Sequence, residues 1–240
     1  VVAPHARVRR RERAVTHADI RPAATMILWR HPEAPEVLMG RRKTGAVFMP
    51  GKMVFPGGAV DAADARVALA RGIDPVCRAR LEDASDVAPD ALAVAAIRET
   101  WEETGLRVGR QAPWRDPPDA WREFAAAGVR PDAEPLRFVF RAVTPPGRPR
   151  RFDARFFLAH VDCVAGDAEA LAGDGELADL QWVALDRLDD FDLPFVTRVV
   201  LAEIAPGLGR PGPPARVPFF ASASGDAFFR WLGEGPAAPQ

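Results

Sequence analysis

Apolar residues in this chain fall into short runs, each bounded by polar or turn-forming residues. The runs "ATMILWR" at 24–30 and "VLMGR" at 37–41 flank the segment "HPEAPE", so they predict two strands joined as a hairpin. Three later apolar runs predict further strands of the same kind. They are "LRFVFRAV" at 136–143, "ARFFLAHV" at 154–161 and "LADLQWVAL" at 177–185.

Helix-forming patterns lie between these strands. The segment 89–104 places Val94, Ile97 and Trp101 on one face and ends before Gly105, so it predicts an amphipathic helix. Shorter helices are predicted over "DAWREFAAAG", over "PFVTRVVLAEIA" and near 63–71. Strands on both sides of a central helix, in mixed order, predict an α+β fold built as an α/β/α sandwich around a mixed sheet.

Composition narrows the class of protein. The 240 residues are 48% hydrophobic and 27% charged, with a net charge of -1, as in an ordinary soluble globular protein. This charge gives no reason to expect a nucleic-acid or membrane partner. Cys77 and Cys163 cannot make a disulfide framework, and no apolar run reaches the ~18 residues of a membrane span. The basic stretch at 7–13 has no apolar segment after it, so we expect a cytoplasmic protein.

Three glutamates crowd the end of the predicted central helix. Glu99, Glu102 and Glu103 share one face, and like charges at this spacing cost ~0.2–0.5 kcal/mol per pair. They also lie at the C-terminal end, where the helix dipole disfavours negative charge. One interpretation is a solvated acidic face; the other is a site for a divalent cation, because Mg²⁺ binds oxygen ligands.

The residues around these acids resemble a known motif. "RETWEETGL" at 98–106 is similar to the second half of the Nudix box, G-x5-E-x7-R-E-U-x-E-E-x-G-U, where U is a bulky aliphatic residue. The first half is present upstream in "FPGGAVDAAD", where Gly58 is followed after five residues by Asp64. Asp64 replaces the expected glutamate, and Thr100 replaces the aliphatic residue. The sequence between Asp64 and Arg98 has 33 positions where the motif has seven, an interruption of 26 residues.

The resemblance to the Nudix family, which covers about residues 20–190, implies a fold, a reaction and a set of site residues. It implies a Nudix-type sandwich that uses Mg²⁺ or Mn²⁺ to hydrolyse a diphosphate bond in a nucleoside diphosphate derivative. The metal ligands would be Gly57, through its backbone carbonyl, with Glu99, Glu102 and Glu103. Arg98 would orient a carboxylate, although an ordinary surface pairing explains this residue equally well. The general base would be Glu176, chosen among the loop acids Asp167, Glu169, Asp174 and Glu176.

The interruption also bears on the substrate. It resembles a branch of the family that contains peroxisomal-type coenzyme A diphosphatases and their bacterial relatives, so coenzyme A or an acyl derivative is the favoured substrate. A separate coenzyme A signature is half present, with matches at Leu38, Arg42, Gly51 and Phe55. We expect Arg42, Lys52 and Gly58 to bind the substrate. The alternatives are ADP-ribose, a dinucleotide or another nucleotide sugar as substrate, a non-catalytic Nudix-like binding domain, or a structural protein with an acidic helix.

The expected organisation is one domain with a short arm. We predict a basic N-terminal arm at 1–19 and a single Nudix domain at 20–235, with insertions at about 65–88 and 110–135. The first insertion should loop out, and its deletion should alter substrate preference more than folding. We expect the protein to bind a small nucleotide diphosphate and to bind neither nucleic acid nor a membrane. A homodimer is compatible with this expectation.

Overall fold

A computed structural model describes residues 19–223 and 226–233. The first 18 residues of the predicted basic arm therefore lie outside the described part of the chain. Within the described ranges, no helix is both long enough and apolar enough to cross a membrane.

The main sheet is mixed. Its strands in the described part of the chain are β1 (Ile20–Arg30), β2 (Glu36–Arg42), β3 (Met53–Val54), β4 (Gly57–Ala59), β7 (Arg137–Val143), β8 (Arg151–His160), β10 (Leu177–Ala184), β11 (Val217–Ala223) and β12 (Asp226–Leu232). They follow the order β10-β2-β1-β8-β7-β11-β12, with β3 paired to β2 and β4 paired to β1. β1 is parallel to β8 and β11 is parallel to β7, whereas β1 and β2 form the antiparallel hairpin that the sequence predicts.

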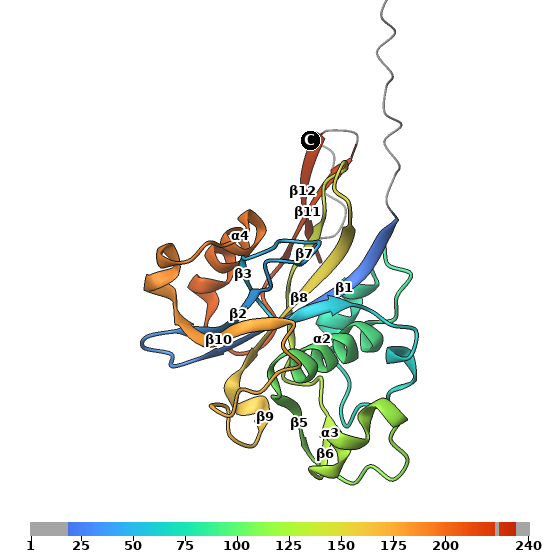
Figure 1. The fold of residues 1–240 in the computed structure, drawn as a ribbon. Coiled ribbons are helices and arrows are strands. Elements are labelled where there is room, and N and C mark those ends of the chain that lie inside the picture. The colour runs from blue at the N-terminus through green and yellow to red at the C-terminus, as the bar shows by residue number, and fades with distance from the viewer. Residues whose placement is uncertain (1–18, 224–225, 234–240) are drawn as a thin grey trace, which may run out of the picture.

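Helices cover both faces of this sheet. They are α1 (Pro75–Glu82), α2 (Pro89–Thr104), α3 (Arg122–Ala126) and α4 (Phe195–Ile204), together with the 3-10 turns η1 (Asp64–Arg66), η2 (Asp119–Trp121), η3 (Val161–Cys163), η4 (Leu185–Asp190) and η5 (Ala205–Gly207). Because side chains alternate along a strand, Met26 and Leu28 of β1 join the core beneath α1 and α2, while Ile27 and Trp29 join the core beneath α4. Figure 1 shows α2 and α4 on opposite sides of the sheet, which confirms the predicted α/β/α sandwich.

A small second sheet extends from the C-terminal end of α2. It consists of β5 (Arg107–Gln111), with β6 (Val129–Pro131) and β9 (Val164–Ala165) on either side. The predicted helix at 119–128 is present as η2 and α3. Trp121 and Phe124 in these turns are buried and contact Trp101 of α2, so the segment predicted as a second insertion packs on the central helix.

The segment predicted as the first insertion differs from expectation. The prediction of a helix near 63–71 was wrong. Only the short 3-10 turn η1 forms there, and the α-helix of this segment is α1, further along the chain. Asp74 accepts hydrogen bonds from the N–H groups of Val76 and Cys77, and Pro75 fills the first helical position, which together fix the start of α1.

This segment also belongs to the core. The side chains of Val67, Ile73, Cys77 and Leu81 are buried in the cluster beneath α2. Residues 65–88 are therefore more than a surface loop, because their removal would expose apolar surface of the central helix and the sheet. Their burial argues against the expectation that deletion would alter substrate preference more than folding.

Leu81→Ala tests whether the segment supports the fold. Leu81 is 1% exposed, so the substitution should lower the free energy of unfolding by about 2–5 kcal/mol. The matched control is Val76→Ala in the same helix, where Val76 is 45% exposed and a change within about 0.5 kcal/mol is expected. Urea denaturation measures both values, and equal small losses would show that α1 is not part of the core.

Candidate active site

The last turns of α2 bring carboxyl groups against the turn at Gly57 and Gly58. The Gly57 N–H donates a hydrogen bond to Oε2 of Glu103 at 2.8 Å. A Cβ on Gly58 would overlap the carboxyl group of Glu99, so the space beside this glycine is taken by that acid. A Cβ on Gly57 would lie 2.6 Å from the backbone oxygen of Ala24, because β4 is paired closely with β1. We call the side chains of Glu99, Glu102 and Glu103 the acidic cluster.

Arg98 connects this cluster to the other half of the motif. Its Nε and Nη2 donate to the two carboxylate oxygens of Asp64, at 2.9 and 3.1 Å. Its Nη1 donates to Glu99 Oε1 at 2.8 Å and to Glu102 Oε2 at 2.9 Å. Its Nη2 also donates to the carbonyl oxygen of Ala59 at 3.0 Å. Arg98 therefore bonds to Asp64 and to two of the three carboxyl groups of the cluster.

Burial dominates the electrostatics of the cluster. Loss of solvent raises the pKa of Glu103 to about 8 and that of Glu99 to about 7, and it also raises the pKa of Glu102. Burial opposes the charge of Arg98 as well, but hydrogen bonding to Asp64 and the nearby carboxylates raise the pKa of this guanidinium above its usual range. Burial therefore disfavours the charged form of all three carboxyl groups, although Arg98 bonds to two of them.

A loop between β9 and β10 covers the C-terminal end of α2. We call residues 166–176 the strap. The N–H groups of Ala172 and Asp174 donate to the carbonyl oxygens of Thr104 and Glu102, at 2.9 and 2.8 Å. These carbonyls have no partner within the helix, so the strap satisfies them and weakens the negative end of the helix dipole. The strap thereby reduces the cost of placing acids at this end.

The strap carries the four acids considered as general bases. Oε2 of Glu176 is 4.0 Å from Nη2 of Arg42. Burial is the main cause of the raised pKa values of Glu99 and Glu103, and the nearby charge of Glu176 raises both a little further. Asp174 lies near Glu102, but its side chain accepts the N–H of Glu176. The other two acids are engaged elsewhere: Asp167 accepts the N–H of Glu169, and Glu169 pairs with Arg30.

The predicted substrate-binding residues separate into two groups. Arg42 and Gly58 lie at the cluster, whereas Nζ of Lys52 pairs with Oδ1 of Asp192 at 2.6 Å. Among the described residues, no interaction joins Lys52 to the acidic cluster. Of the other positions that match the coenzyme A signature, Leu38 and Phe55 are core residues.

The two residues that depart from the motif, Asp64 and Thr100, are both buried. Asp64, 1% exposed, holds Arg98 through two hydrogen bonds, so this acid is central to the site. The spacing of the motif was the signal that could have found it. Thr100 is fully buried where an aliphatic residue is expected, and its hydroxyl donates to the carbonyl oxygen of Ala96 at 2.7 Å. The helix itself therefore satisfies the buried hydroxyl.

The chain is similar in fold and sequence to a protein of known structure. The crystal structure of a NUDIX hydrolase from Alicyclobacillus acidocaldarius is 35% identical in sequence to this chain. The match covers 77% of this chain and 90% of that chain, with a TM-score of 0.59. The chain belongs to the Nudix hydrolase family.

A second Nudix relative covers a smaller part of the molecule. A protein of Caenorhabditis elegans named as a nudix hydrolase is 31% identical over 138 residues, which cover 52% of this chain and 40% of that protein. The chain thus spans less than half the length of this curated relative. No family model matches the chain.

The donor set of this Nudix chain can be compared with what a divalent cation requires. Carboxylate oxygens are suitable ligands for Mg²⁺, and the acidic cluster offers three carboxyl groups. Within the described ranges, no three Asp, Glu, His or Cys side chains form a ready ligand group. Arg98 holds Glu99 and Glu102, while Gly57 holds Glu103. The carboxylate oxygens are chemically suited to a divalent cation. To bind one, they would have to give up hydrogen bonds to Arg98 and to the Gly57 N–H.

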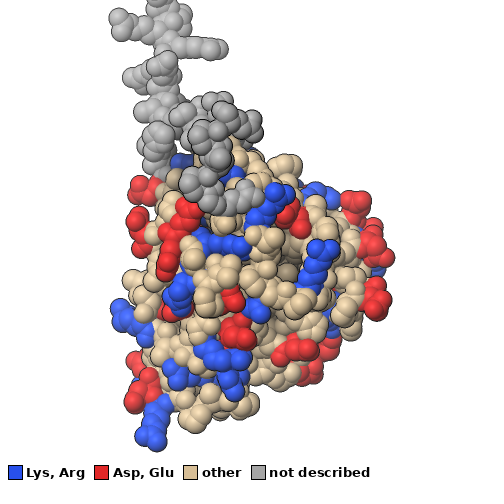
Figure 2. Space-filling model, turned by 180° about the vertical axis from the view of Figure 1, so that it is seen from behind, with Lys and Arg blue, Asp and Glu red and all other residues tan. Residues whose placement is uncertain are grey.

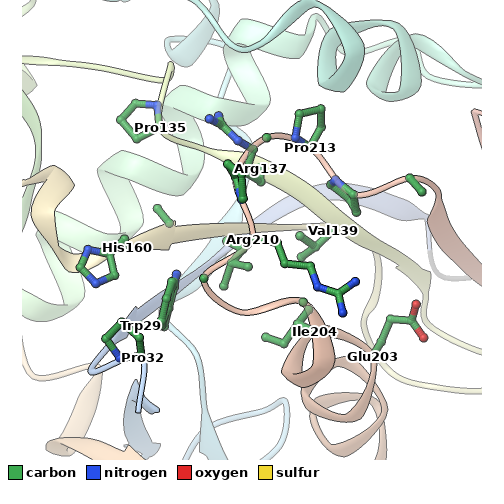
Figure 3. A pocket seen from close by; sticks show the side chains of 18 of the residues that line it. Trp29, Pro32, Pro135, Arg137, Val139, His160, Glu203, Ile204, Arg210 and Pro213 are labelled. Carbon is green, nitrogen blue, oxygen red and sulfur yellow. The ribbon is translucent and has the colours of Figure 1, made fainter. Parts of the chain in front are cut away.

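A pocket of about 620 Å³ lies apart from the acidic cluster. Its lining includes Trp29 and Val139, which belong to the core beneath α4, on the face of the sheet opposite α2. Lys and Arg are interspersed with Asp and Glu over the face of the molecule in Figure 2. Figure 3 shows the same mixture within the pocket, where Arg137, Arg210 and Glu203 are all part of the lining. Its charge therefore selects no single class of ligand, unlike the acidic cluster.

Arg98→Ala tests the connection between the two halves of the Nudix box. The variant leaves Asp64 buried without its partner, so the free energy of unfolding should fall by about 3–5 kcal/mol. The control is Arg78→Ala, which breaks the more exposed pair with Asp90 and should cost no more than about 1 kcal/mol. Urea denaturation compares the two, and equal losses would contradict a central role for Arg98.

The pH dependence of stability tests the buried acids. From the ordinary pKa of 4.5 up to the raised values of about 7 and about 8, the folded chain binds more protons at Glu99 and Glu103 than the unfolded chain does. The free energy of unfolding of metal-free protein should therefore fall as pH rises through this window. Urea denaturation in a chelator at several pH values measures the slope. Glu103→Gln should flatten it, and the exposed control Glu203→Gln should not; the same slope in both variants would refute the assignment.

Proposed function

We propose that this chain hydrolyses the diphosphate bond of a nucleoside diphosphate derivative, with coenzyme A or an acyl-coenzyme A as the leading substrate. Membership of the Nudix hydrolase family supports the reaction class. The observation that carries the proposal is the acidic cluster at the end of α2, buried against the Gly57–Gly58 turn with Glu176 beside it.

The side chains around the cluster have separable roles. Arg98 orients Glu99 and Glu102, and the Gly57 N–H orients Glu103, so the three carboxyl groups are held in a fixed relation. Held by Glu99, Glu102 and Glu103, Mg²⁺ or Mn²⁺ would neutralise charge on the diphosphate oxygens and make water a better nucleophile.

Two further side chains act on the water and the substrate. Glu176 takes a proton from the attacking water as the water oxygen bonds to phosphorus and the bridging P–O bond breaks. Arg42 lies beside Glu176 and can neutralise a phosphate oxygen through its guanidinium. For coenzyme A and one water, the products are 3′,5′-ADP and 4′-phosphopantetheine.

The interrupted motif supports coenzyme A over other diphosphates. Asp64 and Arg98 remain bonded although 33 residues separate them, so the chain keeps both halves of the motif together across the interruption. This interruption resembles the coenzyme A diphosphatase branch. The half-present signature adds one residue at the cluster, Arg42, since Leu38 and Phe55 serve the core.

A substrate panel with matched variants tests this function. Wild-type protein with Mg²⁺ or Mn²⁺ should release phosphomonoesters from coenzyme A, and a chelator should abolish the release. Glu102→Gln and Glu103→Gln remove a charge but keep the shape, so kcat should fall by orders of magnitude with folding intact. Glu176→Gln should lower kcat by about 10²–10⁴-fold. The exposed control Glu203→Gln should leave the rate unchanged.

Three outcomes would change the proposal in different ways. Hydrolysis of ADP-ribose or a dinucleotide without hydrolysis of coenzyme A keeps the reaction class and replaces the substrate. Undiminished turnover in both Glu102→Gln and Glu103→Gln would show that the cluster is not the catalytic site. Binding of these nucleotides without any turnover would identify a Nudix-like binding domain.

A further inference from the structure

The strap is fixed to α2 by a close backbone contact. Gly173 lies between the two residues whose N–H groups bond to α2, and a Cβ at this position would overlap the carbonyl oxygen of Glu103. A side chain would therefore push the strap away from the helix. Glu176 follows closely, and its N–H donates to Oδ1 of Asp174 at 2.8 Å, so its position depends on this contact.

A second attachment holds the other end of the strap. Glu169 pairs with Nη1 of Arg30, the last residue of β1. Arg30 is itself held in place, because its Nε donates to Oε2 of Glu36 at 2.7 Å and its guanidinium lies 4.4 Å from the ring centroid of Trp182. The side chain of Arg30 is 17% exposed, so it is a stationary anchor for an otherwise exposed acid.

We propose that Arg30 and Glu169 form a latch that positions Glu176 over the acidic cluster, with Gly173 as the second fixing point. This inference rests on the proposed function, in which Glu176 accepts a proton from water. Arg30, Glu169 and Gly173 are positioning residues, because they act on the reaction through Glu176. The latch joins the strap to the end of β1, and the contact at Gly173 joins the strap to the end of α2.

The exposure of Glu169 makes the latch testable without unfolding the protein. The Glu169 side chain is 64% exposed, and exposed ion pairs contribute little to global stability. A merely decorative pair would alter neither stability nor turnover when broken. A latch would alter turnover alone, since a small misplacement of a reacting group is costly to the rate.

Glu169→Gln and Asp179→Asn form a matched pair for this test. Asp179 pairs with Arg41 at 3.0 Å, and its side chain is 61% exposed, so it resembles Glu169 in exposure and in linking distant parts of the chain. Glu169→Gln should lower kcat by about 10–100-fold with unchanged KM and unchanged Tm. Asp179→Asn should leave all three values unchanged. A wild-type kcat for Glu169→Gln would overturn the latch.

Gly173→Ala and Gly207→Ala test the second fixing point by hydrogen exchange. A Cβ on Gly207 meets no atom within 4 Å, so this variant is the control. In Gly173→Ala the amides of Ala172 and Asp174 should exchange faster, while those in the first turns of α2 should remain protected. Exchange at wild-type rates in Gly173→Ala would overturn the role of this contact, whether or not any substrate is hydrolysed.

A double-mutant comparison separates the latch from the proposed function. If Glu169 acts through Glu176, the variant Glu169→Gln/Glu176→Gln should be no slower than Glu176→Gln alone. Additive losses would overturn the latch while leaving the proposed hydrolysis intact. Full activity in Glu176→Gln would overturn both the latch and the base assignment, whereas loss of activity on chelation would still support the reaction class.

Discussion

Arg98 joins parts of the chain that the sequence separates. Arg98 belongs to α2, the helix that follows the interruption and carries the acidic cluster. Its guanidinium binds Asp64, which precedes the interruption. Asp64 is 1% exposed and Arg98 is 8% exposed. Burying either charge would be costly without the other, because the pair compensates for the lost solvent. The same guanidinium holds Glu99 and Glu102. The excursion through α1 can therefore be long without separating the two halves, because the entropic cost of closing a loop grows slowly with its length.

The placement of acids at the end of α2 has a physical explanation. In an isolated helix these acids would repel one another and oppose the dipole. Here Arg98 neutralises part of the charge, the Gly57 N–H binds Glu103, and the strap donates two N–H groups to the last carbonyls. The pKa values of Glu99 and Glu103 remain raised because burial outweighs these contacts. The basis for proposing a bound cation is the presence of these carboxyl groups beside the Gly57–Gly58 turn.

The sequence predicts the elements whose signals are local. The apolar runs that form the β1–β2 hairpin are such signals, as is the box spacing that puts the glutamates of α2 near Gly58. The predicted single apolar face of α2 was incomplete, because every residue from 91 to 98 is buried and the helix has no exposed face there. Elements that depend on distant partners are harder to predict. α1 is held by the burial of Cys77 and Leu81 beneath α2, and β11 pairs in parallel with β7, far away in sequence. Neither contact leaves a periodic pattern in its own segment.

The site shows the same division between local and distant signals. The motif indicates which acids share a face, but not that the Gly57 N–H binds Glu103 or that Lys52 pairs with Asp192. Both depend on how separate loops dock. The role of Glu176 as base stays a prediction, supported by its place beside the cluster.

The most direct test of a metal-dependent site is a crystal structure of the protein soaked with Mn²⁺, with anomalous scattering recorded. We predict an anomalous peak among the carboxyl groups of Glu99, Glu102 and Glu103, beside the Gly57–Gly58 turn, and its loss in Glu103→Gln. A Mn²⁺ peak at another place, with the acidic cluster still bonded to Arg98 and Gly57, would contradict it.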